Sequence, residues 1–426
     1  MPFSRKTRIV AATFVATTLA VLLVANLALG DKRIDEHVRT LYSVEEPQFR
    51  RVMEVMLGPG MLPGNRVQPL LNGDEIFPAM LDAIRGARRT ITLETYVYYS
   101  GRIGAEFSRA LAERARDGVA VHVIFDAVGS GRIDERYVQE MAAAGVQVAR
   151  YNPVRWYTLA RMNNRTHRKL LVVDGAVGFT GGAGIADEWT GNAQDPKHWR
   201  DTHFRIQGPV VAQLQAAFME NWIEITGEVL HGAEYFPPLA PAGGETAQFF
   251  VSSPGGGGES MQLMYLLSIA AAAKRLAISA SYFVPDEVEL HALADAARRG
   301  VRVQIIVPGP HNDAEIVRRA SRAGWGELLR AGVEIYEYQP TMYHCKVMIV
   351  DGLWVSVGST NFDQRSFSVN DEANLNVLDT AFAREQERIF AADLERSRRV
   401  TLEQWQSRPW TEKLWEHSMG LLGSQL

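Results

Sequence analysis

The sequence is poor in cysteine, and it has no excess of basic residues. Its one cysteine, Cys345, cannot form a disulfide within the chain, and a thiolate metal site would need several sulfur or imidazole ligands together. The formal net charge at pH 7 is −4, whereas nucleic-acid-binding domains are usually basic. The composition therefore favours neither a metal centre nor a nucleic-acid partner.

A long uncharged apolar run stands at the N-terminus, over residues 9–30. As a helix it would span roughly 33 Å, enough for the hydrocarbon core of a bilayer. Basic residues flank it on both sides, so its orientation is undecided. A cleaved signal peptide is the alternative, although its apolar region is usually shorter and this run has no clear cleavage site. We predict a retained transmembrane anchor over 9–30, which would hold the protein at the cell membrane.

The rest of the chain has the composition of a globular protein. Apolar residues make up 46% and charged residues 22% of the 426 residues, and this length fits two domains. Stretches rich in proline and glycine, 58–64 and 237–244, indicate linkers or loops. We therefore predict a linker or helical segment over 31–66, a first unit over 67–240 and a second unit over 241–426.

The two predicted units share one rhythm of strands and helices. In each unit, a strand-like run is followed by a helical pattern, a second strand, a second helix and a third strand. Glycines close these helices where a helix end needs a left-handed residue, at Gly118 and Gly145 in the first unit and at Gly300 and Gly332 in the second. The predicted strands are 91–98, 119–125 and 146–151, and then 276–284, 301–307 and 333–338.

This rhythm predicts the fold class. Strands that alternate with helices favour an α/β fold with a largely parallel sheet covered by helices. Its repetition favours two similar α/β sandwich units that pack against each other with pseudo-twofold symmetry. Any two α/β units would share such a rhythm, so the repeat alone leaves two unrelated units open.

One motif occurs once in each unit, at the same offsets, and it favours a duplication. The first copy comprises His167, Lys169, Asp174, Gly181 and Gly182, and the second comprises His344, Lys346, Asp351, Gly358 and Ser359. A histidine and a lysine two residues apart on a strand project from the same face. Asp-Gly predicts a tight hairpin turn, and glycine allows the returning backbone to approach a ligand closely. Each unit is thus expected to present an imidazole beside an ammonium.

Two such pairs around one cavity suit phosphodiester chemistry. A neutral imidazole can attack phosphorus and form a covalent phosphoenzyme. The second imidazole, protonated, can donate its proton to the leaving alkoxide and then deprotonate an incoming alcohol or water. The two ammonium groups can stabilise the charge that builds on the non-bridging oxygens. This chemistry needs no metal or other cofactor. For either motif alone, a histidine that merely packs in a strand is the alternative.

The paired motifs resemble those of the phospholipase D superfamily, in particular those of its bacterial cardiolipin synthase branch. The resemblance covers residues 67–426 and rests on the segments 164–175, 199–203, 282–286 and 358–363. It implies an enzyme of the phospholipase D type that acts on phospholipids through a phosphohistidine intermediate.

The resemblance also implies roles for the motif residues. His167 would be the nucleophile and His344 the general acid and base. Lys169 and Lys346 would bind the phosphate.

Further residues of the two motifs would support that site. Gly181, Gly182, Ser359 and Asn361 would line the phosphate pocket. Asp174 and Asp351 complete the motifs and are expected to hold the hairpins rather than to touch substrate.

In related enzymes a carboxylate downstream of each motif orients its histidine. The resemblance assigns Glu372 to His344 and Asp201 to His167. Such a carboxylate would fix the tautomer and stabilise the imidazolium, as in hydrolytic triads.

The first unit departs from the family pattern in two places. The family's Gly-Gly-x-Asn ends in Gly184 here, so one hydrogen bond of the pocket would be missing, and we expect slower turnover or altered selectivity rather than inactivity. An insertion over 154–163 could admit acyl chains or be an ordinary loop. The C-terminal segment, with Trp410 and Trp415, is expected to dock on the core, and an interfacial helix is the alternative.

These observations predict a membrane-anchored phosphatidyltransferase that makes cardiolipin and glycerol from two phosphatidylglycerols. Its expected partners are the phospholipid substrate and the membrane. A hydrolytic phospholipase D or another phosphatidyltransferase would use the same residues and differ in the acceptor. The acidic balance and the anchor disfavour a nuclease of the same superfamily, and two complete His-Lys pairs disfavour a non-catalytic lipid-binding scaffold.

Overall fold

The computed structural model describes residues 4–6, 13–18, 34, 36, 38–39, 42–153, 164–254 and 259–420. Contacts divide the chain into two units, Met1–Asp35 and Glu36–Leu426, and the sheet with its helices belongs to the second. The insertion at 154–163 lies outside the described residues, and so does most of the anchor predicted at 9–30. Among the residues that are described, no helix is long and apolar enough to cross a membrane.

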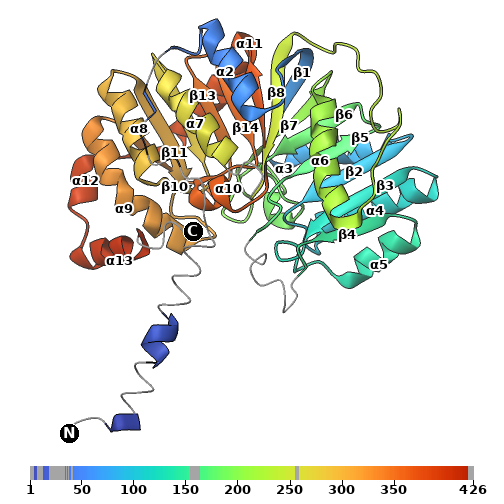
Figure 1. Ribbon diagram of the computed structural model, residues 1–426, viewed down its shortest axis with the longest axis horizontal. Helices are drawn as coiled ribbons and strands as arrows, with labels where there is room; N and C mark the ends of the chain where they lie inside the picture. The colour runs from blue at the N-terminus through green and yellow to red at the C-terminus, as the bar shows by residue number, and fades with distance from the viewer. Residues whose placement is uncertain are drawn as a thin grey trace. The chain divides into compact units, whose positions relative to one another are not determined.

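A mixed sheet of fifteen strands, counted over the described residues, forms the framework of the second unit (Figure 1). Its first half runs in the spatial order β1 (Leu62–Leu71), β7 (Thr202–Gln207), β6 (Val177–Gly181), β5 (Leu170–Val173), β2 (Thr90–Thr95), β3 (Ala120–Asp126) and β4 (Gln147–Tyr151). Its second half runs in the order β8 (Glu245–Ser252), β16 (Glu372–Leu378), β14 (Trp354–Gly358), β13 (Lys346–Val350), β9 (Arg275–Ala280), β11 (Arg302–Pro308), β12 (Glu334–Tyr338) and β17 (Ser397–Val400). A separate parallel pair joins β10 (Phe283–Val284) to β15 (Phe362–Asp363).

The two halves meet edge to edge, where β1 pairs antiparallel with β8. Asn65 fastens this junction, because its side-chain amide donates to the carbonyl of Glu245 on β8 at 3.3 Å as well as to that of Leu62 on β1 at 2.6 Å. Read outward from the junction, the strands of the two halves follow the same order, and β17 is an addition to the second half. The predicted pair of similar units is therefore confirmed, but they share one continuous sheet.

The prediction of a largely parallel sheet is wrong. Within each half only three neighbouring strands are parallel, β2-β3-β4 and β9-β11-β12, and the remaining neighbours are antiparallel. The physical reason lies in the connections: crossover helices join the parallel strands, whereas tight turns join β5 to β6 and β13 to β14. The strands themselves lie within a few residues of the predicted runs.

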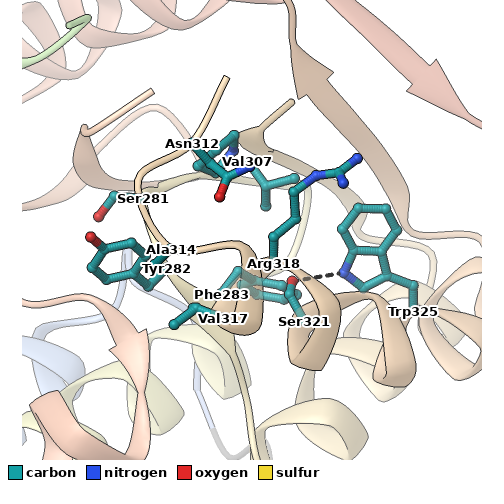
Figure 2. A pocket seen from close by; sticks show the side chains of 11 residues that line it. Ser281, Tyr282, Phe283, Val307, Asn312, Ala314, Val317, Arg318, Ser321 and Trp325 are labelled. Atoms are coloured by element: carbon teal, nitrogen blue, oxygen red, sulfur yellow. Dashed lines mark hydrogen bonds between the residues drawn. The ribbon is translucent and has the colours of Figure 1, made fainter. Parts of the chain in front are cut away.

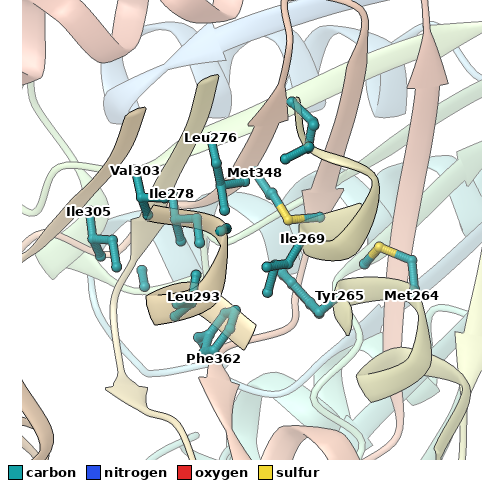
Figure 3. Close-up of a cluster of buried hydrophobic side chains, with 14 of the residues drawn as sticks. Met264, Tyr265, Ile269, Leu276, Ile278, Leu293, Val303, Ile305, Met348 and Phe362 are labelled. Carbon is teal, nitrogen blue, oxygen red and sulfur yellow. The ribbon is translucent and has the colours of Figure 1, made fainter. Parts of the chain in front are cut away.

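Helices cover both faces of the sheet (Figure 1). One face carries α3 (Asn72–Arg85), α4 (Arg102–Arg116) and α5 (Glu135–Ala143) over the first half, and α2 (Pro47–Leu57), α7 (Glu259–Ala271), α8 (Glu287–Arg298) and α9 (Glu315–Ala331) over the second. The other face carries α6 (Val211–Thr226) and α11 (Thr380–Glu395). Side chains from α7, α8 and the strands β9, β11 and β13 meet in the core shown in Figure 3.

The core under α6 and α11 contains residues of both halves. Phe204 of β7 and Phe249 of β8 belong to the same buried cluster, together with Leu375 of β16. Burying apolar surface is the main favourable term in folding, and here that surface spans the β1–β8 junction. The halves are thus held together by a shared core as well as by strand pairing.

The glycines predicted to end helices have the backbone that this position needs. Gly118, Gly145, Gly300 and Gly332 have φ of +89°, +101°, +93° and +96°. Left-handed backbone of this kind lacks a steric penalty in glycine alone, so these four predictions are confirmed.

The C-terminal helices pack on α9, which confirms that this segment docks on the core. Glu416 of α13 (Trp410–Gly420) accepts an ion pair from Arg322 of α9 at 2.9 Å and a second from Arg408. The face of α13 turned away from the core exposes 74% of Trp410 and 58% of Trp415.

Candidate active site

Each histidine of the duplicated motif lies just before a strand and is tied to the other half of the sheet. The backbone N–H of His167 donates to the carbonyl of Asp371 at 2.9 Å, and that of His344 donates to the carbonyl of Arg200 at 2.7 Å. β5 begins after His167 and Lys169, and β13 begins at Lys346, so the histidines precede the strands on which we expected them. The bonds between the halves bring both motifs to one place.

The carboxylates exchange partners between the halves, which makes the predicted assignment wrong. His167 Nδ1 lies 2.9 Å from Glu372 Oε1, and His344 Nδ1 lies 2.7 Å from Asp201 Oδ2. Each histidine is therefore oriented by a carboxylate of the other half. The reason is that Asp371 and Arg200, which precede these carboxylates, pair with the chain at the opposite motif.

Buried arginines fix the segments that carry these groups. Arg200, next to Asp201, forms a bidentate ion pair with Asp393 of α11, with both N–O distances at 2.9 Å. Arg168, between His167 and its lysine, donates to the carbonyl of Ala217 at 2.9 Å. A planar guanidinium that is bonded at both ends leaves the neighbouring backbone little freedom.

Both lysines bond to the backbone of their own motif. Lys169 Nζ donates to the carbonyl of His167 at 2.7 Å, and Lys346 Nζ donates to the carbonyl of His344 at 2.9 Å and to Ser281 Oγ at 2.6 Å. These bonds hold the two ammonium groups beside the two imidazoles. The pairing of imidazole with ammonium predicted for each unit is confirmed.

His167, Lys169, His344 and Asn361 line a single cavity, with an empty volume of about 1380 Å³ that is partly open to solvent. Asn361 Oδ1 accepts a hydrogen bond from Ser281 at 2.6 Å, which orients its amide.

Ser359 and the glycine pair support the carboxylates rather than forming the cavity wall. The hydroxyl of Ser359 donates to Glu372 Oε2. A Cβ on Gly182 would lie 2.3 Å from Asp201 Oδ1, and a Cβ on Gly181 would lie 2.6 Å from His203 Cα. We expected a ligand to approach these glycines closely, but the atoms that approach them belong to the protein itself.

Trp189 occupies the space beside the position where the family has asparagine. A Cβ on Gly184 would lie 2.8 Å from the Cβ of Val97 and 3.3 Å from the Trp189 ring. The indole N–H of Trp189 donates to Asp201 Oδ2 at 2.9 Å, and its ring centroid lies 5.2 Å from that of His344. In the first half, the indole of Trp189 thus lies beside Gly184, the position where the family has asparagine, and it positions the carboxylate of Asp201.

The two motif aspartates lie at the far ends of the hairpins from the histidines. Asp174 accepts hydrogen bonds from the backbone N–H groups of Arg88, Arg89 and Thr90, at 2.7 Å for Arg89. Asp351 accepts the equivalent bonds in the second half, from residues 273–275. Both aspartates have positive φ, at +52° and +51°, so they hold the turns as we expected.

Burial controls the ionisation of the central groups. It lowers the pKa of His167 to about 4, against the opposing effect of Glu372, and it lowers the pKa of Lys169 to about 7. Burial would raise the pKa of Glu372 and of Asp201, but the paired histidines and nearby lysines hold both below their usual values. His167 is therefore a neutral imidazole beside an ionised carboxylate, the state that a nucleophile needs.

Sequence reasoning missed most of the cavity wall. Tyr96 lies edge-on to His167 with centroids 5.1 Å apart, and the ring of Trp199 lies 5.5 Å from that of His344. Arg132 and Glu188 complete the side nearest Trp199. Tyr96 stands in the run predicted as strand 91–98, which as β2 ends one residue before Tyr96, whereas Trp199 belongs to a segment that the family resemblance had marked.

A smaller pocket adjoins the cavity behind Tyr282 (Figure 2). Its empty volume is about 300 Å³, and its lining includes Phe283, Val307, Val317 and Trp325. Tyr282 lines both spaces, and the mostly apolar lining of the smaller one suits hydrocarbon rather than a charged group.

Comparisons with known proteins agree with this geometry. The family model "Cardiolipin synthase, PLD-like domain" matches residues 80–222 and 265–394. The chain is 38% identical over 360 residues to the cardiolipin synthase of Geobacillus kaustophilus, a match that covers 84% of this chain and 72% of that protein. It is 37% identical over 349 residues to cardiolipin synthase A of Pseudomonas fluorescens, covering 80% of this chain and 71% of that protein.

Solved structures share the fold at lower identity. Phosphatidylserine synthase of Haemophilus influenzae superposes with a TM-score of 0.68 at 15% identity, over 89% of this chain and all of that one (100%). Polyphosphate kinase of Porphyromonas gingivalis gives a TM-score of 0.55 at 12% identity, over 88% of this chain and 53% of that one. The sequence matches over both halves carry the assignment: the chain belongs to the cardiolipin synthase family of phospholipase D-type phosphatidyltransferases.

Proposed function

We propose that this enzyme joins two phosphatidylglycerols into cardiolipin and glycerol through a phosphohistidine at His167. The observation that carries the proposal is the crossed pairing of the histidines. Because the Nδ1 atoms of His167 and His344 bond to carboxylates, each histidine keeps Nε2 for chemistry in the shared cavity. The names of the curated relatives support the choice of product.

In the first step, Nε2 of His167 attacks the phosphorus of the donor lipid. The bond from phosphorus to the headgroup oxygen breaks, and His344 gives its proton to the departing glycerol. Lys169 and Lys346 stabilise the negative charge on the non-bridging oxygens. Burial and Lys346 lower the pKa of His344, and the bound anionic phosphate opposes this and favours its protonated form.

In the second step, a glycerol hydroxyl of the acceptor lipid attacks the phosphohistidine. His344 takes the proton of that hydroxyl, and the bond from phosphorus to His167 Nε2 breaks. Both histidines return to their starting protonation, and the products are cardiolipin and the glycerol released before. The two steps as written require no metal and no redox partner.

We also propose that the enzyme works at the cell membrane, held by the anchor predicted over 9–30. Both lipids of the reaction reside in a bilayer, so a tethered enzyme would meet its substrate without leaving the surface.

The test is to incubate the full chain with phosphatidylglycerol vesicles and to analyse the lipids by mass spectrometry. Cardiolipin with an equal amount of glycerol is expected, and His167→Ala should produce neither. If phosphatidic acid forms without cardiolipin, the enzyme is a hydrolase and the proposal is wrong. If the wild type and His167→Ala give equal lipid profiles, the protein is not an enzyme for this lipid and the proposal is wrong.

A further inference from the structure

A second hollow lies next to the catalytic cavity, beside Trp199. This outer groove is lined by Tyr99, Arg102, Arg132, Glu188, Lys197 and Trp199, among others, and its empty volume is about 1290 Å³. Four of these residues, Tyr99, Arg132, Glu188 and Trp199, line the catalytic cavity as well. The two spaces therefore adjoin each other.

The groove lies where the second lipid must arrive. The ring of Trp199 is 5.5 Å from that of His344, the residue that exchanges a proton with the alcohol in both steps. An alcohol that attacks the phosphohistidine approaches opposite His167, because the entering and leaving groups lie in line at phosphorus. The remainder of the acceptor lipid then extends away from His167 and into the outer groove.

The acceptor lipid brings a second phosphate, which lies with the rest of that lipid away from Lys169 and Lys346. During the second step Lys169 and Lys346 hold the phosphoryl group bonded to His167. The acceptor's own phosphodiester is separated from its reacting hydroxyl by the glycerol carbons and carries a negative charge. It requires a cationic group beyond His344.

Arg132 stands at that place. Its guanidinium lies over the ring of Tyr99, 4.9 Å from the centroid, at the junction of cavity and groove. Stacking on an aromatic face leaves the in-plane N–H donors of an arginine available for a phosphate. Arg102 and Lys197 add positive charge farther out in the groove.

One of the two acids that line the groove, Asp187, is already engaged. Asp187 accepts the backbone N–H groups of Arg102 at 3.0 Å and of Ile103 at 2.9 Å. Its negative charge is thus directed at the start of α4 rather than at Arg132.

We infer that Arg132, supported by Arg102 and Lys197, binds the phosphodiester of the acceptor phospholipid and places its glycerol hydroxyl at His344. This assignment rests on the proposed phosphatidyl transfer. Arg132 would be a specificity-determining residue, because it favours an alcohol that carries a phosphate over free glycerol or water.

The test compares two reactions of the full chain in mixed micelles. One is cardiolipin formation from phosphatidylglycerol, and the other is exchange of the phosphatidylglycerol headgroup with isotope-labelled free glycerol, an acceptor without phosphate. In Arg132→Gln, the ratio of cardiolipin formation to glycerol exchange should fall about 10- to 100-fold, the effect of losing a charge-assisted hydrogen bond. Arg132→Lys should recover part of that ratio.

Arg136→Gln is the matched control, because Arg136 is an exposed arginine nearby in sequence that pairs with Asp134 at 2.6 Å. It should leave both rates unchanged. An equal fall of both rates in Arg132→Gln, or no fall in either, would overturn the assignment of Arg132. A wild type that exchanges glycerol but forms no cardiolipin would instead overturn the proposed function.

Discussion

At the scale of single residues, the two histidines differ from an ordinary buried pair because each depends on a carboxylate of the opposite half. Glu372 bonds to His167 and Asp201 bonds to His344, so a change at one carboxylate should affect one histidine and spare the other. This selectivity distinguishes a positioning role from a general loss of structure.

Glu372→Gln should lower kcat by about 100- to 10,000-fold, because an amide cannot fix the imidazole tautomer as a carboxylate does. In a spectrum of ¹⁵N-labelled histidine, it should move the signals of His167 and leave those of His344 in place. Asp201→Asn should give the opposite pattern. Movement of the His344 signals by Glu372→Gln would contradict the crossed pairing.

The lowered pKa of Lys169 predicts an alkaline limit on substrate capture. Burial lowers this pKa to about 7, so the free enzyme loses the ammonium charge above that pH and binds an anionic phosphate less well. We expect kcat/KM for phosphatidylglycerol to fall as the pH rises from about 7 to 9. In Lys169→Arg the level should be lower and this decline should become shallower, because arginine keeps its charge while His344 still titrates. If kcat/KM falls just as steeply in the variant, a group other than Lys169 causes the decline.

At the scale of strands and turns, the two motif aspartates should matter for folding. Asp174 accepts three backbone N–H groups that lead into β2, so Asp174→Ala should lower the free energy of unfolding by about 1–3 kcal/mol. Its KM should stay near that of the wild type, and denaturant unfolding with kinetics measures both. Asp82→Ala is the control, because that side chain is 79% exposed. A large change in KM without a loss of stability would instead indicate that Asp174 acts in substrate binding.

Restoring the family asparagine at Gly184 should lower both the stability and the turnover of the enzyme. In Gly184→Asn the new side chain would collide with Val97 and Trp189, at a cost of about 1–3 kcal/mol for an overpacked site. Displacement of Trp189 should also lower kcat, because its indole donates to Asp201. Gly244→Ala has open space and should change neither property. Thermal unfolding and turnover of the two variants provide the test, and a stable, faster Gly184→Asn would refute this view.

The elements were largely predictable from the sequence, and their pairing was not. Alternating residues and closing glycines were enough for β2, β3, β9 and β11, because local backbone preferences set them. The Asp-Gly turns also signalled two antiparallel hairpins, β5–β6 and β13–β14, so the parallel prediction overlooked a local signal that was present. The partners of His167 and His344 depend on how two halves face each other, and no local pattern carries that information.

At the scale of the whole molecule, one sheet and one shared core join the halves. We therefore expect a single calorimetric unfolding transition for the Glu36–Leu426 unit, with equal calorimetric and van't Hoff enthalpies. Asn65→Ala removes the side-chain bond to Glu245 across the β1–β8 junction and should lower Tm while keeping one transition. Two resolved transitions in the wild type would show that the halves unfold independently.

The crossed carboxylates also bear on the origin of the chain. β7 and β16 hold equivalent places in the two halves, and Asp201 and Glu372 stand at their beginnings. A single ancestral copy would have carried a histidine and a carboxylate that could not serve each other. Only two identical chains, joined edge to edge, would have completed both pairs. Within one chain the two copies are free to differ, and the first has Gly184 at the position where the second has Asn361.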